Sequence, residues 1–224
     1  MRTLPHRSIH TQFHSSFYSW FYSSFYSWDV ASEQSGSTSK KELRQRFRFE
    51  RSQRNLGGDW LHLLNADEIK NANVIASYIS YGDEPTTSGL NNAILESGRK
   101  LLVPRTDTSG AITWIIWKAD STLEKPAKWA WKKSAFAQPL GDPYLGSIDV
   151  VITPALRVDR NGVRLGQGGG SYDRALIEPD ARSAWKVALL HDEELTSEAL
   201  PREPHDVLVD AVALPEIVVR FKRN

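Results

Sequence analysis

Apolar segments alternate with polar and glycine-rich segments over most of the chain after residue 39. Two nearly continuous apolar runs, Asp149–Leu156 and Lys186–Leu190, are typical of strands buried on both faces of a parallel sheet. Three further strands are predicted: Asn73–Tyr81, Lys100–Pro104 and Ala111–Trp117. The pattern therefore predicts a sheet whose central strands are hidden from solvent.

Helix signals lie before and between these strands. Ser39 and Glu42 have the spacing of a capping box, which predicts a helix that begins at Lys40. Thr87–Glu96 has helical spacing of apolar residues, and Gly98 follows as a C-terminal cap. Strands that alternate with helices predict an α/β fold. We expect a single domain with a parallel or mixed central sheet flanked by helices, in a Rossmann-like three-layer arrangement.

The N-terminal segment differs from the rest of the chain. The stretch FYSWFYSSFYSW repeats aromatic residues and serine with a period of four, and it has no apolar core or cleavage site of a secretory signal peptide. Three histidines there are spaced by four, without a carboxylate or cysteine to complete a metal shell: His6, His10 and His14. We interpret residues 1–38 as a disordered or artefactual extension, with an aromatic interaction tail as the alternative, and residues 39–224 as the folded domain.

Composition narrows the class of protein. The chain has 224 residues, 40% hydrophobic and 25% charged, with a formal net charge of +1. A charge so near zero creates no general attraction for nucleic acid or membrane. The absence of cysteine excludes disulfides and thiolate metal sites, and no apolar run reaches the roughly 18–20 residues of a membrane span. We expect a cytoplasmic protein that binds neither nucleic acid nor membrane.

One glycine-rich loop indicates a binding site. The stretch RLGQGGGSYDR, Arg164–Arg174, has four glycines in the five positions Gly166–Gly170. Each ordered glycine costs about 0.5–1 kcal/mol relative to alanine, so we expect a ligand that approaches this backbone closely. A strand precedes the loop and a short helix follows it, which is an arrangement that directs backbone N–H groups toward an anion. The loop is neither a Walker A loop nor a GxGxxG fingerprint, and a mobile surface turn is the alternative.

The loop resembles the glycine-rich segment of the 5-formyltetrahydrofolate cyclo-ligase family, also called 5,10-methenyltetrahydrofolate synthetases. Three other segments resemble this family in the same order along the chain: Lys40 with Arg44, YISYGDEPTT (Tyr78–Thr87) and LPREPHDVLVD (Leu200–Asp210). The resemblance extends from Lys40 to about Pro215. Two residues depart from the family pattern: Ser171 stands where the first of two adjacent tyrosines is usual, and Gln138 stands where a glutamate is common.

The resemblance implies an ATP-dependent ring closure. ATP would phosphorylate the formyl oxygen of 5-formyltetrahydrofolate, a neighbouring amine of the folate would attack that carbon, and phosphate would leave, giving 5,10-methenyltetrahydrofolate and ADP. This chemistry requires a polyphosphate clamp, a divalent cation and a slot for the pterin. It requires no covalent protein nucleophile, and the sequence offers no convincing one. The implied partners are small molecules, ATP and a reduced folate, and we expect a monomer.

The resemblance also implies roles for individual residues. The ATP-binding residues would be two helix cations and the glycine loop: Lys40, Arg44, Arg164, Leu165, Gly166, Gln167, Gly168, Gly169, Gly170, Ser171 and Tyr172. Asp173 and Asp206 resemble ligands of Mg²⁺, which prefers hard oxygen donors; by themselves they suggest a helix-start acid and a loop acid. Glu84 resembles the carboxylate that binds the folate, and Ile79 would line the same pocket; by themselves they suggest a turn residue and a core residue.

Two other functions stay open. Ser171 and Gln138 favour a non-catalytic protein of the same fold that binds a nucleotide or another phosphate ligand. The basic stretches KKELRQRFRFERSQR and RFKRN suit a nucleic-acid binder, but the near-neutral total charge argues against it. Formation of the methenyl product from 5-formyltetrahydrofolate, ATP and Mg²⁺ separates the three functions.

Overall fold

The computed structural model describes residues 39–54, 57–124 and 137–222. Residues 1–38 lie outside the described residues, and so do His6, His10 and His14. The interpretation of residues 1–38 as an extension therefore stays a prediction. Among the described residues, no helix combines the length and the apolar character that a membrane span requires.

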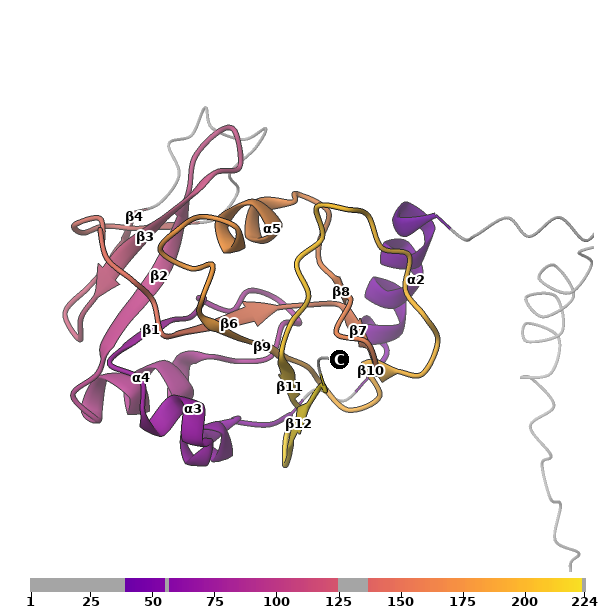
Figure 1. The fold of residues 1–224 in the computed structure, drawn as a ribbon, viewed down its shortest axis with the longest axis horizontal. Coiled ribbons are helices and arrows are strands. Elements are labelled where there is room, and N and C mark those ends of the chain that lie inside the picture. Colours follow the sequence, from indigo (N-terminus) through magenta and orange to yellow (C-terminus); the bar gives the residue numbers. More distant parts are fainter. Residues whose placement is uncertain (1–38, 55–56, 125–136, 223–224) are drawn as a thin grey trace, which may run out of the picture. The chain divides into compact units, whose positions relative to one another are not determined.

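A seven-stranded mixed sheet forms the centre of the fold, in the order β12-β11-β9-β6-β1-β2-β3 (Figure 1). Its strands are β1 (Val74–Ala76), β2 (Lys100–Thr106), β3 (Ile112–Trp117), β6 (Val150–Pro154), β9 (Trp185–Leu189), β11 (Ala211–Ala213) and β12 (Val218–Arg220). The strands from β11 to β2 run parallel, whereas β3 and β12 pair antiparallel at the two edges. The carboxyl ends of the five parallel strands therefore lie along one side of the sheet, where α/β folds bind ligands.

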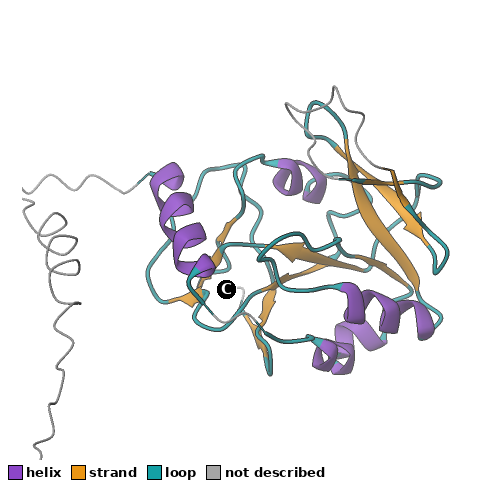
Figure 2. Ribbon diagram, turned by 180° about the vertical axis from the view of Figure 1, so that it is seen from behind, coloured by secondary structure: helices purple, strands orange, loops and turns teal. Residues whose placement is uncertain are grey.

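Helices cover both faces of this sheet, as Figures 1 and 2 show. The helical elements are α2 (Lys40–Ser52), the 3-10 helix η1 (Leu61–Asn65), α3 (Asp67–Lys70), α4 (Ser88–Glu96) and α5 (Ser171–Leu176). Alternate residues of β1 separate two cores: Ile75 packs with residues of η1, α3 and α4, and Val74 packs with residues of α5. This confirms the predicted α/β domain with a mixed sheet flanked by helices.

Two small sheets complete the described structure, and the sequence pattern did not predict them. A three-stranded sheet has the order β10-β7-β8, and a two-stranded sheet pairs β4 with β5. Their strands are β7 (Arg157–Asp159), β8 (Arg164–Leu165), β10 (Leu195–Thr196), β4 (Leu123–Glu124) and β5 (Gln138–Pro139). The hairpin of β7 and β8 connects β6 to the glycine loop, and Leu43 and Phe47 of α2 pack against it. This packing places α2 beside the loop.

The strand predicted at Asn73–Tyr81 is shorter than expected, because β1 ends at Ala76. Side chains satisfy the backbone that follows: Thr87 Oγ1 donates to the Tyr78 carbonyl at 2.7 Å, and Asn91 Nδ2 donates to the same oxygen at 3.0 Å. These bonds replace a strand partner. The segment after β1 is therefore a loop at the carboxyl side of the sheet.

Candidate active site

A cavity of about 480 Å³ lies between the glycine loop, α2 and the segment that contains Asp206. It brings together every residue predicted to bind ATP: Lys40, Arg44, Arg164, Leu165, Gly166, Gln167, Gly168, Gly169, Gly170, Ser171 and Tyr172. Both predicted metal ligands, Asp173 and Asp206, line the same cavity, and so does Glu84. Thr106, Ile112, Pro154, Glu203 and His205 complete its wall. Residues more than 160 positions apart in sequence thus meet at one cavity, which we call the loop cavity.

The glycine loop has a backbone that favours glycine at Gly168 and Gly170. Gly168 has φ +108°, and a Cβ added there would lie 3.3 Å from Arg44 Nε. Gly170 is the N-cap of α5 with φ +64°, in the left-handed region that favours glycine. A Cβ on Gly166 would lie 2.8 Å from an Arg164 guanidinium nitrogen. The loop backbone therefore lies close to both arginines, and the predicted approach of a ligand stays a prediction.

Two cations on one face of α2 contact this loop. The capping box at Ser39 begins the helix as predicted. Arg44 Nε donates to the Gly166 carbonyl at 3.0 Å, and Arg48 donates to the side chain and carbonyl of Gln167 at 2.8 and 2.7 Å. Arg48 was not among the predicted site residues, although it continues the four-residue spacing of Lys40 and Arg44.

Lys40 lies between two acids at the other end of the cavity. Its ammonium contacts Asp206 Oδ2 at 2.5 Å and Glu203 Oε2 at 2.7 Å. Burial alone would lower the pKa of Lys40, but its hydrogen bonds to Asp206 and Glu203 raise the pKa overall. Burial opposes ionisation of Asp206 too, yet the Glu203 N–H and the Lys40 ammonium lower the pKa of Asp206 overall. Both side chains therefore stay charged.

The two predicted metal ligands have different surroundings. Asp173 Oδ1 accepts a bond from Arg164 at 3.0 Å and one from the Val207 N–H at 3.3 Å. Asp206 instead belongs to a group whose ligand atoms lie within 4.8 Å of one another: Glu203, His205 and Asp206. Glu203 and His205 were not predicted, since they carry no motif of their own. Both aspartates line the loop cavity. Asp206 has two further potential metal ligands close to it, Glu203 and His205.

A second cavity of about 420 Å³ adjoins the first, and we call it the tyrosine cavity. It is lined by Tyr78, Ile79, Tyr81, Glu84, Pro104, Thr106, Ala137, Gln138, Pro139, Pro154, Gln167 and Tyr172. Five residues line both cavities: Glu84, Thr106, Pro154, Gln167 and Tyr172. Ile79 therefore lies in the tyrosine cavity together with Glu84, but outside the loop cavity.

Glu84 and Tyr172 stand at the junction of the two cavities. Burial raises the pKa of Glu84, although the Tyr81 N–H, which donates to its carboxylate at 3.1 Å, acts in the opposite direction. Burial and the charge of Glu84 raise the pKa of Tyr172 well above its ordinary value, so the phenol stays protonated. Its hydroxyl is buried and has no hydrogen-bond partner among the described residues. The junction thus offers a partly buried acceptor and a buried hydroxyl to a ligand.

Comparisons with known proteins agree with the resemblance seen in four sequence segments. Residues 36–215 match the 5-formyltetrahydrofolate cyclo-ligase family. The chain is 34% identical to the 5-formyltetrahydrofolate cyclo-ligase of Mycolicibacterium smegmatis over 154 residues, 63% of this chain and 73% of that protein. It is 29% identical to the Escherichia coli 5-formyltetrahydrofolate cyclo-ligase over 153 residues, 66% of this chain and 80% of that protein.

The fold is also found in a solved structure. The NMR structure of Aquifex aeolicus 5,10-methenyltetrahydrofolate synthetase superposes with a TM-score of 0.64 and 23% identity, covering 83% of this chain and 94% of that one. At this identity the likeness concerns the fold alone. Because the family match covers most of the sequence, the chain belongs to the 5-formyltetrahydrofolate cyclo-ligase family.

Proposed function

We propose that this protein catalyses the ATP-dependent cyclisation of 5-formyltetrahydrofolate to 5,10-methenyltetrahydrofolate, with release of ADP and phosphate. The observation that carries the proposal is the pair of adjoining cavities. One is built from cations and glycine backbone, as a polyphosphate requires, and the other from aromatic and apolar side chains with one carboxylate. Five shared lining residues join them, so two substrates bound side by side can exchange a phosphoryl group.

The loop cavity would bind ATP. The backbone of Gly166–Gly170 and the cations of Lys40, Arg44 and Arg164 supply fixed donors and positive charge for the phosphates. In phosphoryl transfer, positioning and electrostatic stabilisation account for most of the catalysis. Arg44 also holds the loop through the Gly166 carbonyl, so it fixes the loop's shape as well as its charge. No covalent intermediate with the protein is needed.

The tyrosine cavity would bind the reduced folate. A pterin ring is flat and carries an amine and ring N–H groups, which match an aromatic slot with a carboxylate acceptor. Glu84 supplies that acceptor, and Ile79 contributes apolar surface to the same wall. Because Glu84 lines both cavities, the formyl group of a folate held there would lie near the nucleotide side.

The donor set near Asp206 fits Mg²⁺. Carboxylate oxygens are the protein ligands that this ion prefers, and it usually keeps several waters. Asp173 and Asp206 would hold it, with Glu203 as a further acid beside Asp206. Bound there, Mg²⁺ would offset negative charge on the phosphates. Lys40, which now bridges Asp206 and Glu203, would turn its ammonium toward the polyphosphate.

Absorbance of the methenyl product tests the function directly. Purified protein with 5-formyltetrahydrofolate, ATP and Mg²⁺ should form 5,10-methenyltetrahydrofolate, and omission of either substrate should abolish the signal. A protein that binds ATP but forms no product would support the non-catalytic nucleotide-binding alternative instead. Light scattering and cell fractionation test the expected monomer and cytoplasmic location.

The domain limits form part of the proposal. Residues 39–224 would constitute the catalytic domain, and residues 1–29, which include the aromatic segment, would be dispensable. A shortened chain that begins at Val30 should bind ATP as tightly as the full chain. Weaker binding by the shortened chain would show that the aromatic segment contributes to the site.

A further inference from the structure

The carboxylate proposed to bind the folate is held by a tight turn of four residues, Tyr81–Glu84. The Glu84 N–H donates to the Tyr81 carbonyl at 3.2 Å, and the Tyr81 N–H donates to the Glu84 carboxylate at 3.1 Å. These two bonds fix the carboxylate within the turn. They do not fix the turn relative to the sheet, so its position depends on contacts made by other residues.

His191 supplies such a contact from the carboxyl end of β9. Its Nε2 lies 3.0 Å from the carbonyl oxygen of Asp83, the residue before Glu84. A carbonyl can only accept a hydrogen bond, so Nε2 carries the proton. The other ring nitrogen, Nδ1, is buried and has no hydrogen-bond partner among the described residues.

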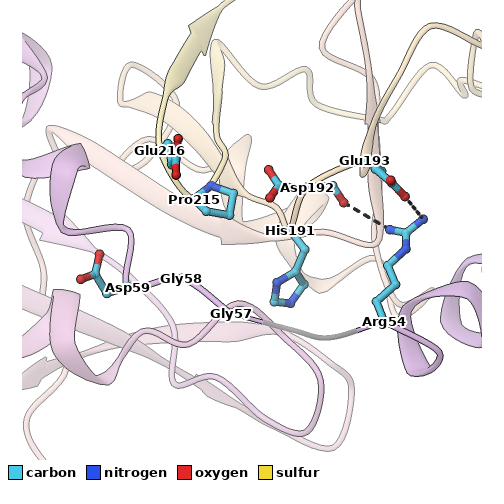
Figure 3. A pocket seen from close by; sticks show the side chains of 9 residues that line it. All are labelled: Arg54, Gly57, Gly58, Asp59, His191, Asp192, Glu193, Pro215 and Glu216. Carbon is cyan, nitrogen blue, oxygen red and sulfur yellow. Dashed lines mark hydrogen bonds and ion pairs between the residues drawn. The ribbon is translucent and has the colours of Figure 1, made fainter.

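The ring of His191 is itself held on several sides. It packs against Trp60 in an edge-to-face arrangement, with centroids 5.5 Å apart and planes at 72°. The backbone N–H of His191 donates to Glu194 Oε2 at 2.9 Å, and Arg51 pairs with Glu194 Oε1 at 2.7 Å, so the backbone at His191 is also held in place. Figure 3 shows the ring pointing away from the carboxylates of Asp192 and Glu193, which line the same cavity of about 790 Å³.

Burial of an unpaired ring nitrogen opposes folding, since a buried acceptor loses its hydrogen bond to water. His191 is 6% exposed, and an aromatic ring without nitrogen would keep the contact with Trp60 and avoid that loss. Packing alone therefore does not account for a histidine here. The bond to Asp83 is the contact that phenylalanine would not make.

We propose that His191 is a positioning residue for folate binding. Its bond to Asp83 holds the Tyr81–Glu84 turn in the place where Glu84 faces the junction of the two cavities. The proposal rests on the proposed function, in which Glu84 accepts hydrogen bonds from the pterin. His191 itself lines neither the loop cavity nor the tyrosine cavity.

Steady-state kinetics of His191→Phe test the proposal. The KM for 5-formyltetrahydrofolate should rise about three- to tenfold, the range expected for loss of one hydrogen bond that orients a binding group. The KM for ATP should stay within about twofold, and Tm should be unchanged or higher, because the unpaired nitrogen is gone. His191→Gln, which can donate to Asp83, should recover part of the lost folate affinity. Asp192→Asn, on the exposed neighbouring residue, is the control and should match the wild type.

The double variant His191→Phe/Glu84→Ala separates this inference from the proposed function. If Glu84→Ala raises the folate KM and His191→Phe adds nothing further, the histidine acts through Glu84. Equal rises in both KM values, or a lower Tm with an unchanged folate KM, would overturn the positioning role. If Glu84→Ala leaves the folate KM unchanged, the proposed role of Glu84 fails instead.

Amide hydrogen exchange tests the contact without any substrate. Peptides that cover residues 78–87 should exchange faster in His191→Phe than in the wild type, while peptides of α2 should not change. Unchanged exchange of residues 78–87 would show that His191 does not hold the turn, whatever the kinetics show.

Discussion

The loop cavity and the tyrosine cavity adjoin, yet they are built in opposite ways. The loop cavity takes most of its wall from one continuous stretch, Arg164–Asp173, with cations from α2 added at its side. The tyrosine cavity takes its wall from short, separate segments: Tyr78–Glu84, Pro104, Thr106, Ala137–Pro139, Pro154, Gln167 and Tyr172. Charged side chains and glycine backbone form most of the wall of the loop cavity, whereas aromatic and apolar side chains form most of the wall of the tyrosine cavity.

The difference follows from the two ligands that we propose. A polyphosphate is recognised by many donors at fixed positions, and a glycine-rich backbone next to arginines provides them in a compact motif. A flat heterocycle is recognised by apolar walls and one well-placed acceptor, which strands and loops from distant parts of the chain can supply. Changes in the loop cavity should therefore affect ATP, and changes in the tyrosine cavity should affect the folate.

Asp206→Asn should have the largest effect, because it removes a charge where the two acids and Lys40 meet. Turnover should fall about 10²- to 10³-fold, the range typical for loss of one charge-stabilising group. The Mg²⁺ concentration needed for half-maximal rate should rise. Asparagine keeps an oxygen that can accept from the Glu203 N–H, now at 2.6 Å, but it loses the charge that pairs with Lys40 and that the folded state favours, so Tm should fall at neutral pH. Full activity at low Mg²⁺ would contradict the metal role of Asp206.

Arg44→Ala should come next, and it should weaken ATP binding by about 10- to 150-fold, since one charge-assisted contact contributes roughly 1.5–3 kcal/mol. Isothermal titration with ATP measures this. Arg46→Ala is the matched control on the same helix, because Arg46 pairs with Glu50 at 2.8 Å and does not line either cavity. An ATP affinity of Arg44→Ala equal to that of the control would place α2 outside the nucleotide site.

Glu84→Ala tests whether the two cavities are separate in function. Folate binding should weaken about tenfold or more, because a partly buried acceptor for polar N–H groups is lost, and ATP binding should change by less than about threefold. Glu96→Ala, at the exposed end of α4, serves as the control. Equal losses for ATP and folate would mean that the shared wall residues bind both ligands, and the contrast between the cavities would disappear.

The same contrast explains what the sequence could predict about the site. Gly166–Gly170 could be recognised because a cluster of glycines indicates unusual backbone geometry, as at Gly168 and Gly170. Lys40 and Arg44 were predicted only through the resemblance to the family, since two cations on one helix face are otherwise typical of a solvated surface. Glu203 was missed because its contact with Lys40 joins residues 163 positions apart, and an isolated glutamate in a loop carries no pattern. Arg48 was missed even though its spacing from Arg44 was available.

The fold could be predicted where apolar runs are long. Asp149–Leu156 and Lys186–Leu190 correspond to β6 and β9, the buried centre of the sheet. β11 and β12 have three residues each, which is too short for periodicity to show. The predicted strand at Asn73–Tyr81 extended too far because its apolar residues, among them Tyr78 and Ile79, line a cavity instead of pairing with a strand.

Glu84→Gln should have the smallest effect, and it tests the cost of placing a carboxylate at the junction. Burial raises the pKa of Glu84 above its ordinary value of 4.5, so the folded state disfavours the ionised form more than the unfolded state does. That penalty is fully present at a pH above the raised pKa and is lost as the pH falls below 4.5. Glutamine removes the charge and can still accept from the Tyr81 N–H.

Thermal unfolding across pH measures this penalty. At pH 7–8 the Tm of Glu84→Gln should exceed that of the wild type, by about 2–4 °C for each kcal/mol of penalty removed in a chain of this size. The difference should shrink toward zero as the pH falls through the raised pKa to below the ordinary value. Folate binding should weaken in the same variant, because a pterin N–H would meet a neutral amide instead of a carboxylate. A lower Tm at pH 7–8 would show that the Glu84 charge stabilises the fold, and the carboxylate would then be explained by its electrostatic contribution to stability and not by ligand binding.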